Sequence, residues 1–198
     1  MKYEILLLDF DGVVSPGPYF SKIYCEEFGM KSSLLDPFWE GPKEQANIGK
    51  ADIREELQKV LQEWGWKGSV DELLEYWMNA DSDIDERIKT IAEEFRVHGG
   101  GVYLATDQDY YRTRFIWEER GLKDWMDGRF VSCEVGLLKE NPLFFRRVIE
   151  VLHTDPEKIV FFDDSQSKID AAREIGINAY LYSDFDSVNW KKVLYSPE

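Results

Sequence analysis

The sequence predicts an α/β fold with a parallel sheet between two helix layers and a helical domain inserted after the first strand. Three observations predict it. An apolar run, Ile5-Leu6-Leu7-Leu8, opens the chain, strand and helix patterns alternate from residue 102 onward, and about eighty residues of helical pattern separate the two parts. Strand–helix alternation is typical of parallel sheets that are covered by helices on both faces.

The first strand is expected over residues 5–8, because an uninterrupted apolar run is typical of a strand buried on both faces. The breakers Ser15-Pro16-Gly17-Pro18 follow and redirect the chain. Helical periodicity then continues from about Tyr19 to about His98, with helices expected over 19–28, 52–64, 69–78 and 84–98. The starts at Asp52 and Ser69 have a capping-box pattern, and glycines close three of these helices.

A segment of this length with helices of its own is an inserted domain rather than a loop. We therefore expect a core domain over residues 1–15 and 97–198 and a helical cap domain over residues 16–96. In the second half, strands are expected over 102–105, 130–132, 158–162 and 179–182, and helices over 109–120, 142–153 and 167–175.

Composition narrows the classes of function. The net charge of −15 disfavours binding to nucleic acid or to an anionic membrane. No apolar run reaches about 18 residues, and no signal peptide precedes the first strand, so a cytoplasmic protein is expected. Cys25 and Cys133 are expected to be buried free thiols, because no metal-type cysteine spacing is present. Monomer and homodimer both remain open.

The candidate chemistry collects where the predicted strands end. In an open parallel sheet, ligands bind beyond the carboxyl ends of the strands. The side chains at or just after these ends are those of Asp9, Asp11, Thr106, Asp107, Lys139, Asp163 and Asp164. Acids gather against their own repulsion when a cation holds them together, so this edge is predicted to be a metal-dependent site.

Each of these residues also has an ordinary structural interpretation. Asp11-Gly12 is a common turn pair, and Asp163-Asp164-Ser165 is typical of a helix N-cap. Thr106 alone is better explained as a strand-end residue with no role, and Lys139 alone as a solvated surface lysine. Their joint placement at successive strand ends favours a site.

Four motifs, in order, resemble those of the haloacid dehalogenase superfamily. Asp9-Phe10-Asp11-Gly12 after the apolar run resembles the first motif, and Thr106 resembles the second. Lys139, after Gly136-Leu137-Leu138, resembles the third, and Phe161-Phe162-Asp163-Asp164 resembles the fourth. The resemblance spans the whole core and implies a three-layer, Rossmann-like core with a helical cap between the first and second motifs.

The resemblance implies a Mg²⁺-dependent hydrolase of phosphomonoesters. Asp9 would be the nucleophile that forms an aspartyl-phosphate, and Asp11 the general acid and base. Thr106, Asp107 and Lys139 would lie at the phosphoryl oxygens, as catalytic or binding groups. The side chains of Asp9, Asp163 and Asp164 and the carbonyl of Asp11 would supply metal ligands. An acid at position 11 favours phosphoryl transfer over halide displacement, because halide needs no proton.

Three positions depart from the pattern or extend it. Asp107 stands where many relatives have Asn, and Lys168 stands where an Asn or Asp usually orients the metal shell. We expect Lys168 to pair with Asp163 or Asp164 and to weaken metal binding. In the cap, the segments 18–28 and 38–41 are expected to face the active site. Lys50 follows a turn that resembles a common cap turn and is a candidate for substrate contact, although an ordinary surface position is the favoured interpretation.

A small phosphorylated metabolite is the expected substrate, since a closed helical cap restricts access. A sugar phosphomutase and a non-catalytic phosphate-binding protein of the same fold remain alternatives. A receiver domain of a two-component regulator also gathers acids, a Thr and a Lys at strand ends, but it lacks the two acids on the first strand and the long helical insertion.

Overall fold

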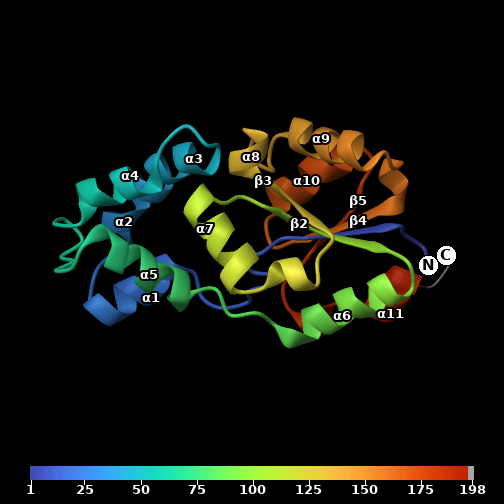
Figure 1. Ribbon diagram of the computed structural model, residues 1–198, viewed down its shortest axis with the longest axis horizontal. Coiled ribbons are helices and arrows are strands. Elements are labelled where there is room, and N and C mark those ends of the chain that lie inside the picture. Colours follow the sequence, from blue (N-terminus) through green and yellow to red (C-terminus); the bar gives the residue numbers. More distant parts are fainter. Residues whose placement is uncertain (196–198) are drawn as a thin grey trace.

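The computed structural model describes residues 1–195, which fold around a five-stranded parallel sheet of order β3-β2-β1-β4-β5 (Figure 1). The strands are β1 (Ile5–Leu8), β2 (Gly101–Thr106), β3 (Gly128–Val131), β4 (Ile159–Asp163) and β5 (Asn178–Leu181). β1 is central and pairs in parallel with both β2 and β4. The predicted parallel sheet is confirmed.

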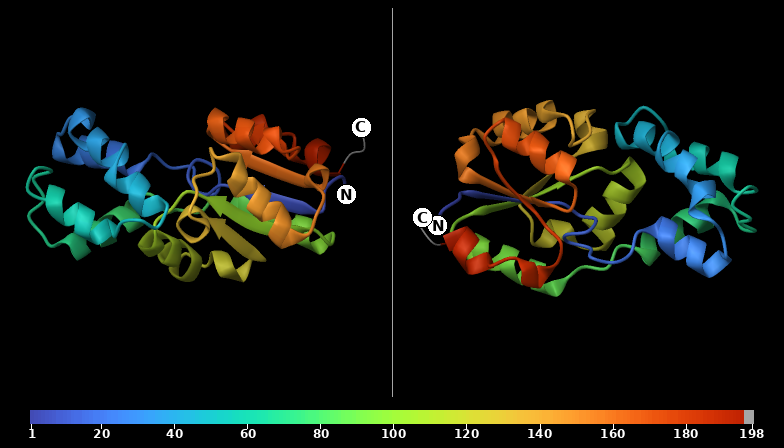
Figure 2. Two further views of the ribbon diagram at one scale, coloured as in Figure 1. Left: turned by 90° about the horizontal axis from the view of Figure 1, so that it is seen from above. Right: turned by 180° about the vertical axis from the view of Figure 1, so that it is seen from behind.

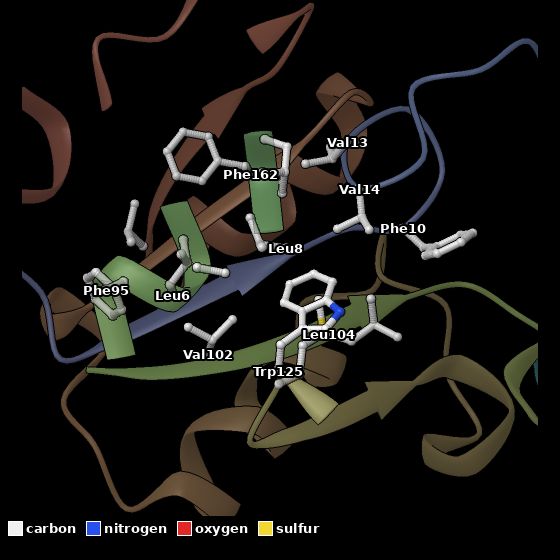
Figure 3. Close-up of a cluster of buried hydrophobic side chains, with 14 of the residues drawn as sticks. Leu6, Leu8, Phe10, Val13, Val14, Phe95, Val102, Leu104, Trp125 and Phe162 are labelled. Atoms are coloured by element: carbon white, nitrogen blue, oxygen red, sulfur yellow. The ribbon is translucent and has the colours of Figure 1, made fainter. Parts of the chain in front are cut away.

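The first strand is buried on both faces, as its apolar run predicts. Successive side chains of a strand point to opposite faces, so Leu6 and Leu8 pack in one hydrophobic cluster and Ile5 and Leu7 in another. Figure 3 shows the first of these clusters, where Leu6 and Leu8 lie near Phe162. Burial on both sides fixes the position of the residues that follow β1.

Helices cover both faces of the sheet (Figure 2). Residues of α6 (Glu86–Val97) and α11 (Trp190–Tyr195) pack in the cluster of Leu6, and residues of α9 (Pro142–Leu152) and α10 (Gln166–Glu174) pack in the cluster of Leu7. Helix α7 (Tyr110–Arg114) continues into a π-helical turn, Phe115–Glu119, and α8 (Ser132–Val135) follows β3. The core therefore has the three layers that the alternating pattern predicts.

The inserted segment forms a helical cap with a core of its own. Its helices are α1 (Phe20–Phe28), α2 (Ser32–Trp39), α3 (Pro42–Asn47), α4 (Ile53–Val60) and α5 (Val70–Ala80). They share a cluster rich in aromatic side chains, among them Phe20, Tyr24, Phe38, Trp64 and Trp77. Figure 1 shows these helices grouped together, with α7 between them and the sheet.

Helix α6 packs with the sheet and not with the cap. Its buried residues Ile88, Ala92 and Phe95 belong to the cluster that contains β1. The two connections between cap and core run side by side, since the Asp85 N–H donates to the Val14 carbonyl at 2.9 Å. We therefore propose that the cap ends near residue 83, earlier than the expected boundary at 96.

Local signals in the sequence had mixed outcomes. The capping box at Ser69 is present, and Gly29 closes α1 in the left-handed conformation. The helix that begins after Asp52 ends at Val60 rather than at Trp64, although the Trp64 N–H still donates to the Val60 carbonyl in a looser last turn. Both cysteines are free, but Cys25 is only half-buried, and Cys133 lies in α8 rather than in a strand.

The register of the sheet brings the strand ends together. Leu8 pairs with Leu104 on one side and with Phe162 on the other. The residues just beyond these pairs, Asp9 and Asp163, therefore lie at one edge, next to the end of β2. Over residues 1–195, no helix is both long enough and apolar enough to cross a membrane.

Candidate active site

Asp9 occupies the first position after β1 and is almost fully buried. Its N–H continues the strand pairing by donating to the Phe162 carbonyl at 3.0 Å, and its Oδ1 accepts a hydrogen bond from the Phe10 N–H at 2.8 Å. Only Oδ2 is thus not engaged by the backbone. The strand holds this carboxylate in a fixed orientation, which is what an attacking group requires.

Gly12 allows the chain to turn sharply next to Asp164 of the fourth motif. Its φ of +78° lies in the left-handed region that favours glycine. A Cβ placed on it would lie 2.3 Å from Oδ2 of Asp164. The Asp-Gly pair is therefore a turn, as its ordinary interpretation predicts, and it also leaves room for a carboxylate of the site.

Lys139 is a completely buried cation between two carboxylates. Its Nζ lies 2.6 Å from Oδ1 of Asp9 and 2.6 Å from Oδ2 of Asp163, and it donates to the Ala105 carbonyl at 3.0 Å. Burial and the neighbouring Asp163 raise the pKa of Asp9 to about 6, although Lys139 acts in the opposite direction. Lys139 and Lys168 thus offset part of the cost of burying the charge of Asp9.

Carboxylate oxygens of Asp9, Asp163 and Asp164 lie within 4.8 Å of one another, which fits the oxygen ligands that Mg²⁺ prefers. Asp163 is tied further by the Ser165 N–H, which donates to its Oδ1 at 2.8 Å. Oδ2 of Asp164 accepts a hydrogen bond from the Tyr19 hydroxyl. Burial and this bond raise the pKa of Tyr19, so the hydroxyl keeps its proton.

Asp11 points toward the cap side and is engaged at both oxygens. Oδ1 lies 2.8 Å from Nη2 of Arg112, and Oδ2 accepts a hydrogen bond from the Gln108 amide at 2.5 Å. Burial alone would raise the pKa of Asp11, but Arg112 and Gln108 outweigh burial and hold this pKa below its usual range. Arg112 also pairs with Asp81 at 2.5 Å, so one buried guanidinium joins the core to the end of the cap.

Lys168 does not make the contacts expected for it. Its Nζ lies 3.5 Å from Oδ2 of Asp107 and 4.0 Å from Oδ2 of Asp9, whereas pairing with Asp163 or Asp164 was expected. Lys139 already holds Asp163, and α10 directs Lys168 across the site toward the end of β2. Burial would lower the pKa of Lys168, but Asp9 and Asp107 raise it above the ordinary value, so the side chain stays charged.

Two partners engage the carboxylate of Asp107, so it does not face the site as an unpaired anion. Its Oδ1 accepts a hydrogen bond from the Lys139 N–H at 2.9 Å, and its Oδ2 faces Lys168. Thr106, at the end of β2, is buried, and its hydroxyl lies 3.5 Å from the Gln108 amide. The two unusual residues of the sequence, Asp107 and Lys168, thus neutralise each other beside the nucleophile.

A cavity of about 300 Å³ opens between Asp11 and the cap. Lys50 does not line it, but borders a separate depression with Gly49 and Tyr110. Lys43 lines the cavity instead. A lysine of the cap therefore does line the cavity, but it is Lys43 of α3 and not the expected Lys50.

Lys43, Gln108 and Arg112 were not identified from the sequence, and Tyr19 was expected only as part of the segment 18–28 that faces the site. All four line the cavity or contact an acid of the site. The sequence does contain one signal for Gln108 and Arg112, which lie two and six residues beyond Thr106. A helix that starts at Asp109 directs Arg112 back to the strand ends. Lys43 carries no such signal, because its position depends on how the cap meets the core.

Comparisons with known proteins agree with this geometry. A family model described as haloacid dehalogenase-like hydrolase matches residues 3–176. Among solved structures, a haloacid dehalogenase family enzyme of Bacteroides thetaiotaomicron in complex with magnesium superposes with a TM-score of 0.78 at 19% identity, covering 99% of this chain and 100% of that one. A predicted hydrolase of the same family from Porphyromonas gingivalis has a TM-score of 0.75 at 18% identity, with full coverage of both chains.

Two curated proteins match over parts of the chain. Bifunctional epoxide hydrolase 2 of Rattus norvegicus is 33% identical over 63 residues, 32% of this chain and 11% of that protein. Sesquiterpene phosphatase astK of Aspergillus oryzae is 27% identical over 96 residues, 47% of each chain. This chain thus spans about a tenth of the epoxide hydrolase and about half of the phosphatase. Because the family model covers most of its length, the chain belongs to the haloacid dehalogenase-like hydrolases.

Proposed function

We propose that this hydrolase removes the phosphoryl group from a small phosphorylated metabolite in a Mg²⁺-dependent reaction with an aspartyl-phosphate intermediate on Asp9. The observation that carries the proposal is the position of Asp9. Its carboxylate is buried at the end of the central strand, lies 2.6 Å from Lys139, and shares a 4.8 Å cluster with Asp163 and Asp164. A phosphatase among the curated relatives and the magnesium in a structural neighbour support the same chemistry.

In the first step, a carboxylate oxygen of Asp9 attacks phosphorus, and the bond from phosphorus to the leaving oxygen breaks. Asp11 gives a proton to that oxygen, which leaves as an alcohol. Because Arg112 holds the pKa of Asp11 low in the free protein, Asp11 would take up this proton from solvent when the phosphate dianion binds beside it. In the second step, Asp11 takes a proton from water as the water attacks the phosphoryl group, and the bond to Asp9 breaks. Asp9 is restored and inorganic phosphate is released, so that one water is consumed in each cycle.

The remaining residues bind and orient. Asp9, Asp163 and Asp164 would hold Mg²⁺, which, when bound, offsets the repulsion between the nucleophile and the phosphoryl oxygens. Lys139 orients Asp9 and Asp163, and Thr106 places its hydroxyl at the end of β2, where a phosphoryl oxygen would lie. Arg112 holds Asp11 where it lines the cavity, so that it would face the leaving group rather than the metal cluster.

A phosphate-release assay on a panel of phosphomonoesters, with Mg²⁺ and with chelator, tests the proposal. We expect Mg²⁺-dependent release that is abolished in Asp9→Asn and retained in Asp170→Asn, which makes the same change at an exposed position of α10. Mass spectrometry of the quenched enzyme should find one phosphoryl group on the peptide that contains Asp9. Release that is unaffected by Asp9→Asn would refute the proposal.

The same assay separates the alternatives. A mutase would transfer the phosphoryl group back to its substrate, so activation by a bisphosphorylated sugar without net phosphate release would identify it. A non-catalytic protein would bind inorganic phosphate with Mg²⁺ but release none from any ester of the panel.

A further inference from the structure

The cavity beside Asp11 has aromatic walls that come from three helices of the cap. Trp39 and Trp77 meet edge to face with ring centroids 5.1 Å apart, and Phe20 stacks on Trp77 at 5.2 Å. All three rings line the cavity, and each is held by the aromatic core of the cap. Phe20 and Trp77 are almost fully buried and Trp39 is half-buried, so Trp39 presents most of the accessible aromatic surface, at an apolar corner with Trp77 that neighbouring rings hold in place before any ligand binds.

The charged groups of the cavity are already paired with one another. Arg112 is bound by Asp11 and Asp81. The other oxygen of Asp81 accepts hydrogen bonds from the Phe20 N–H at 3.0 Å and the Trp77 indole at 3.2 Å. An anionic ligand would therefore find this guanidinium neutralised, and three carboxylates would face it, since Asp107 also lines the cavity.

Lys43, the second cation of the cavity, is also occupied. It is almost fully buried, its Nζ lies 3.3 Å from Oδ2 of Asp109, and it donates to the Asn47 side chain. Its ammonium group also lies 5.4 Å from the ring centroid of Trp77. A second phosphate or a carboxylate on the ligand would have to displace Asp109 from a buried pair, and such a pair is costly to break.

We propose, on the basis of the function proposed above, that the alcohol released by this enzyme carries a flat, uncharged, apolar group that lies against Trp39 and Trp77. A cavity of about 300 Å³ is at the small end of ligand pockets, which favours a group of roughly one or two rings. A sugar would need hydrogen-bond partners for several hydroxyls, and most polar groups of this cavity already have partners. The cap thus selects substrates by shape and apolar contact, not by charge.

Three esters of primary alcohols test the proposal directly: benzyl phosphate, 4-carboxybenzyl phosphate and glycerol 3-phosphate. Their leaving groups are chemically similar, so differences in kcat/KM report on the fit of the cavity. We expect benzyl phosphate to exceed each of the other two by about tenfold or more, the size of one aromatic contact together with its apolar burial. Equal values, or a preference for the carboxylated or the polyhydroxyl ester, would overturn the proposal.

Paired tryptophan variants show whether the preference comes from this cavity. Trp39→Ala should reduce the ratio of kcat/KM for benzyl phosphate to that for glycerol 3-phosphate by about tenfold. Trp66→Ala removes a cap tryptophan that packs on Tyr76, with centroids 5.6 Å apart, and does not line the cavity, so it should leave the ratio unchanged. Thermal unfolding of both variants identifies a loss of folding, and a ratio that is equal in Trp39→Ala and wild type would refute the assignment.

Binding measurements keep this inference separate from the proposed reaction. With Mg²⁺ present, calorimetry compares benzylphosphonate, 4-carboxybenzylphosphonate and methylphosphonate, none of which is hydrolysed. We expect benzylphosphonate to bind about tenfold more tightly than either of the others, even if no ester is turned over. If esters are hydrolysed through Asp9 but the three phosphonates bind equally, the proposed function stands and the inference about the leaving group fails.

Discussion

Lys168 gives the sharpest test of how charge is arranged around the nucleophile. Its Nζ lies 4.0 Å from Oδ2 of Asp9, the oxygen that neither Lys139 nor the backbone engages. Two unit charges at that distance interact by about 4 kcal/mol at an effective dielectric constant of 20. Solvent at the quarter-exposed ammonium and side-chain motion reduce the net effect, and we expect about 1.4 kcal/mol, a factor of ten in affinity.

Lys168→Asn should therefore lower the Mg²⁺ concentration that gives half-maximal activity by about tenfold. The reason is that Lys168 and the metal compete for the same carboxylate. Lys158→Asn is the matched control, since it removes an exposed lysine that pairs with Glu4 at the opposite end of the sheet.

The measurement is a titration of phosphate release, supported by calorimetric titration of Mg²⁺ into each variant. A half-maximal concentration that is unchanged or higher in Lys168→Asn would show that the ammonium does not compete with the metal. In that case its pairing with Asp107 would be its main electrostatic role.

Three further outcomes are expected. Gly12→Ala should abolish Mg²⁺ binding in calorimetry, because the added Cβ would displace Asp164. Gly29→Ala is the control, since Gly29 has a similar φ of +65° and no neighbour within 4 Å, and it should cost only about 1 kcal/mol of stability in urea unfolding. With chelator, Asp9→Asn should raise the free energy of unfolding by up to about 3 kcal/mol at pH 7, because a pKa raised to about 6 means that folding penalises the ionised form. That gain should shrink as the pH falls from 6 to 4, and a gain that is constant with pH would contradict it. Arg112→Met should lower the free energy of unfolding by about 3–5 kcal/mol, and a loss below about 1 kcal/mol would show that its buried carboxylates are otherwise compensated.

The residues at the strand ends could be predicted because their positions follow from local pattern. An apolar run that stops at Asp9 or Asp163 marks the end of a buried strand, and parallel strands bring such ends to one edge. Lys139 could be placed only near this edge, a few residues past the third strand, because nothing in its neighbourhood shows that it returns to β1. Its position depends on a loop held by the hydrogen bond from its own N–H to Asp107.

The cap could be predicted as a unit but not in its contacts. Aromatic periodicity indicated helices, yet which helix presents a cation to the cavity depends on how the cap packs on the core. Lys43 and Lys50 both lie in polar, ordinary stretches, and the position of α3 alone brings Lys43 to the cavity. The boundary that we propose near residue 83 differs from the expected one at 96 for a similar reason, since the apolar stripe on α6 indicates that one face is buried but not what buries it.

The charges of the site determine the order in which its ligands bind. Six carboxylates face three cations, which leaves three negative charges near the place where a phosphate dianion has to enter; the groups are Asp9, Asp11, Asp81, Asp107, Asp163, Asp164, Lys139, Lys168 and Arg112. One Mg²⁺ cancels two of these charges, so inorganic phosphate should bind measurably with Mg²⁺ and at least a hundredfold more weakly with chelator, as about 3 kcal/mol of repulsion implies. Calorimetric titration of phosphate under both conditions measures the difference. Equal affinity without the metal would mean that the lysines alone overcome the negative electrostatic potential at the phosphate site. Lys168 would then be a phosphate ligand rather than a competitor of the metal.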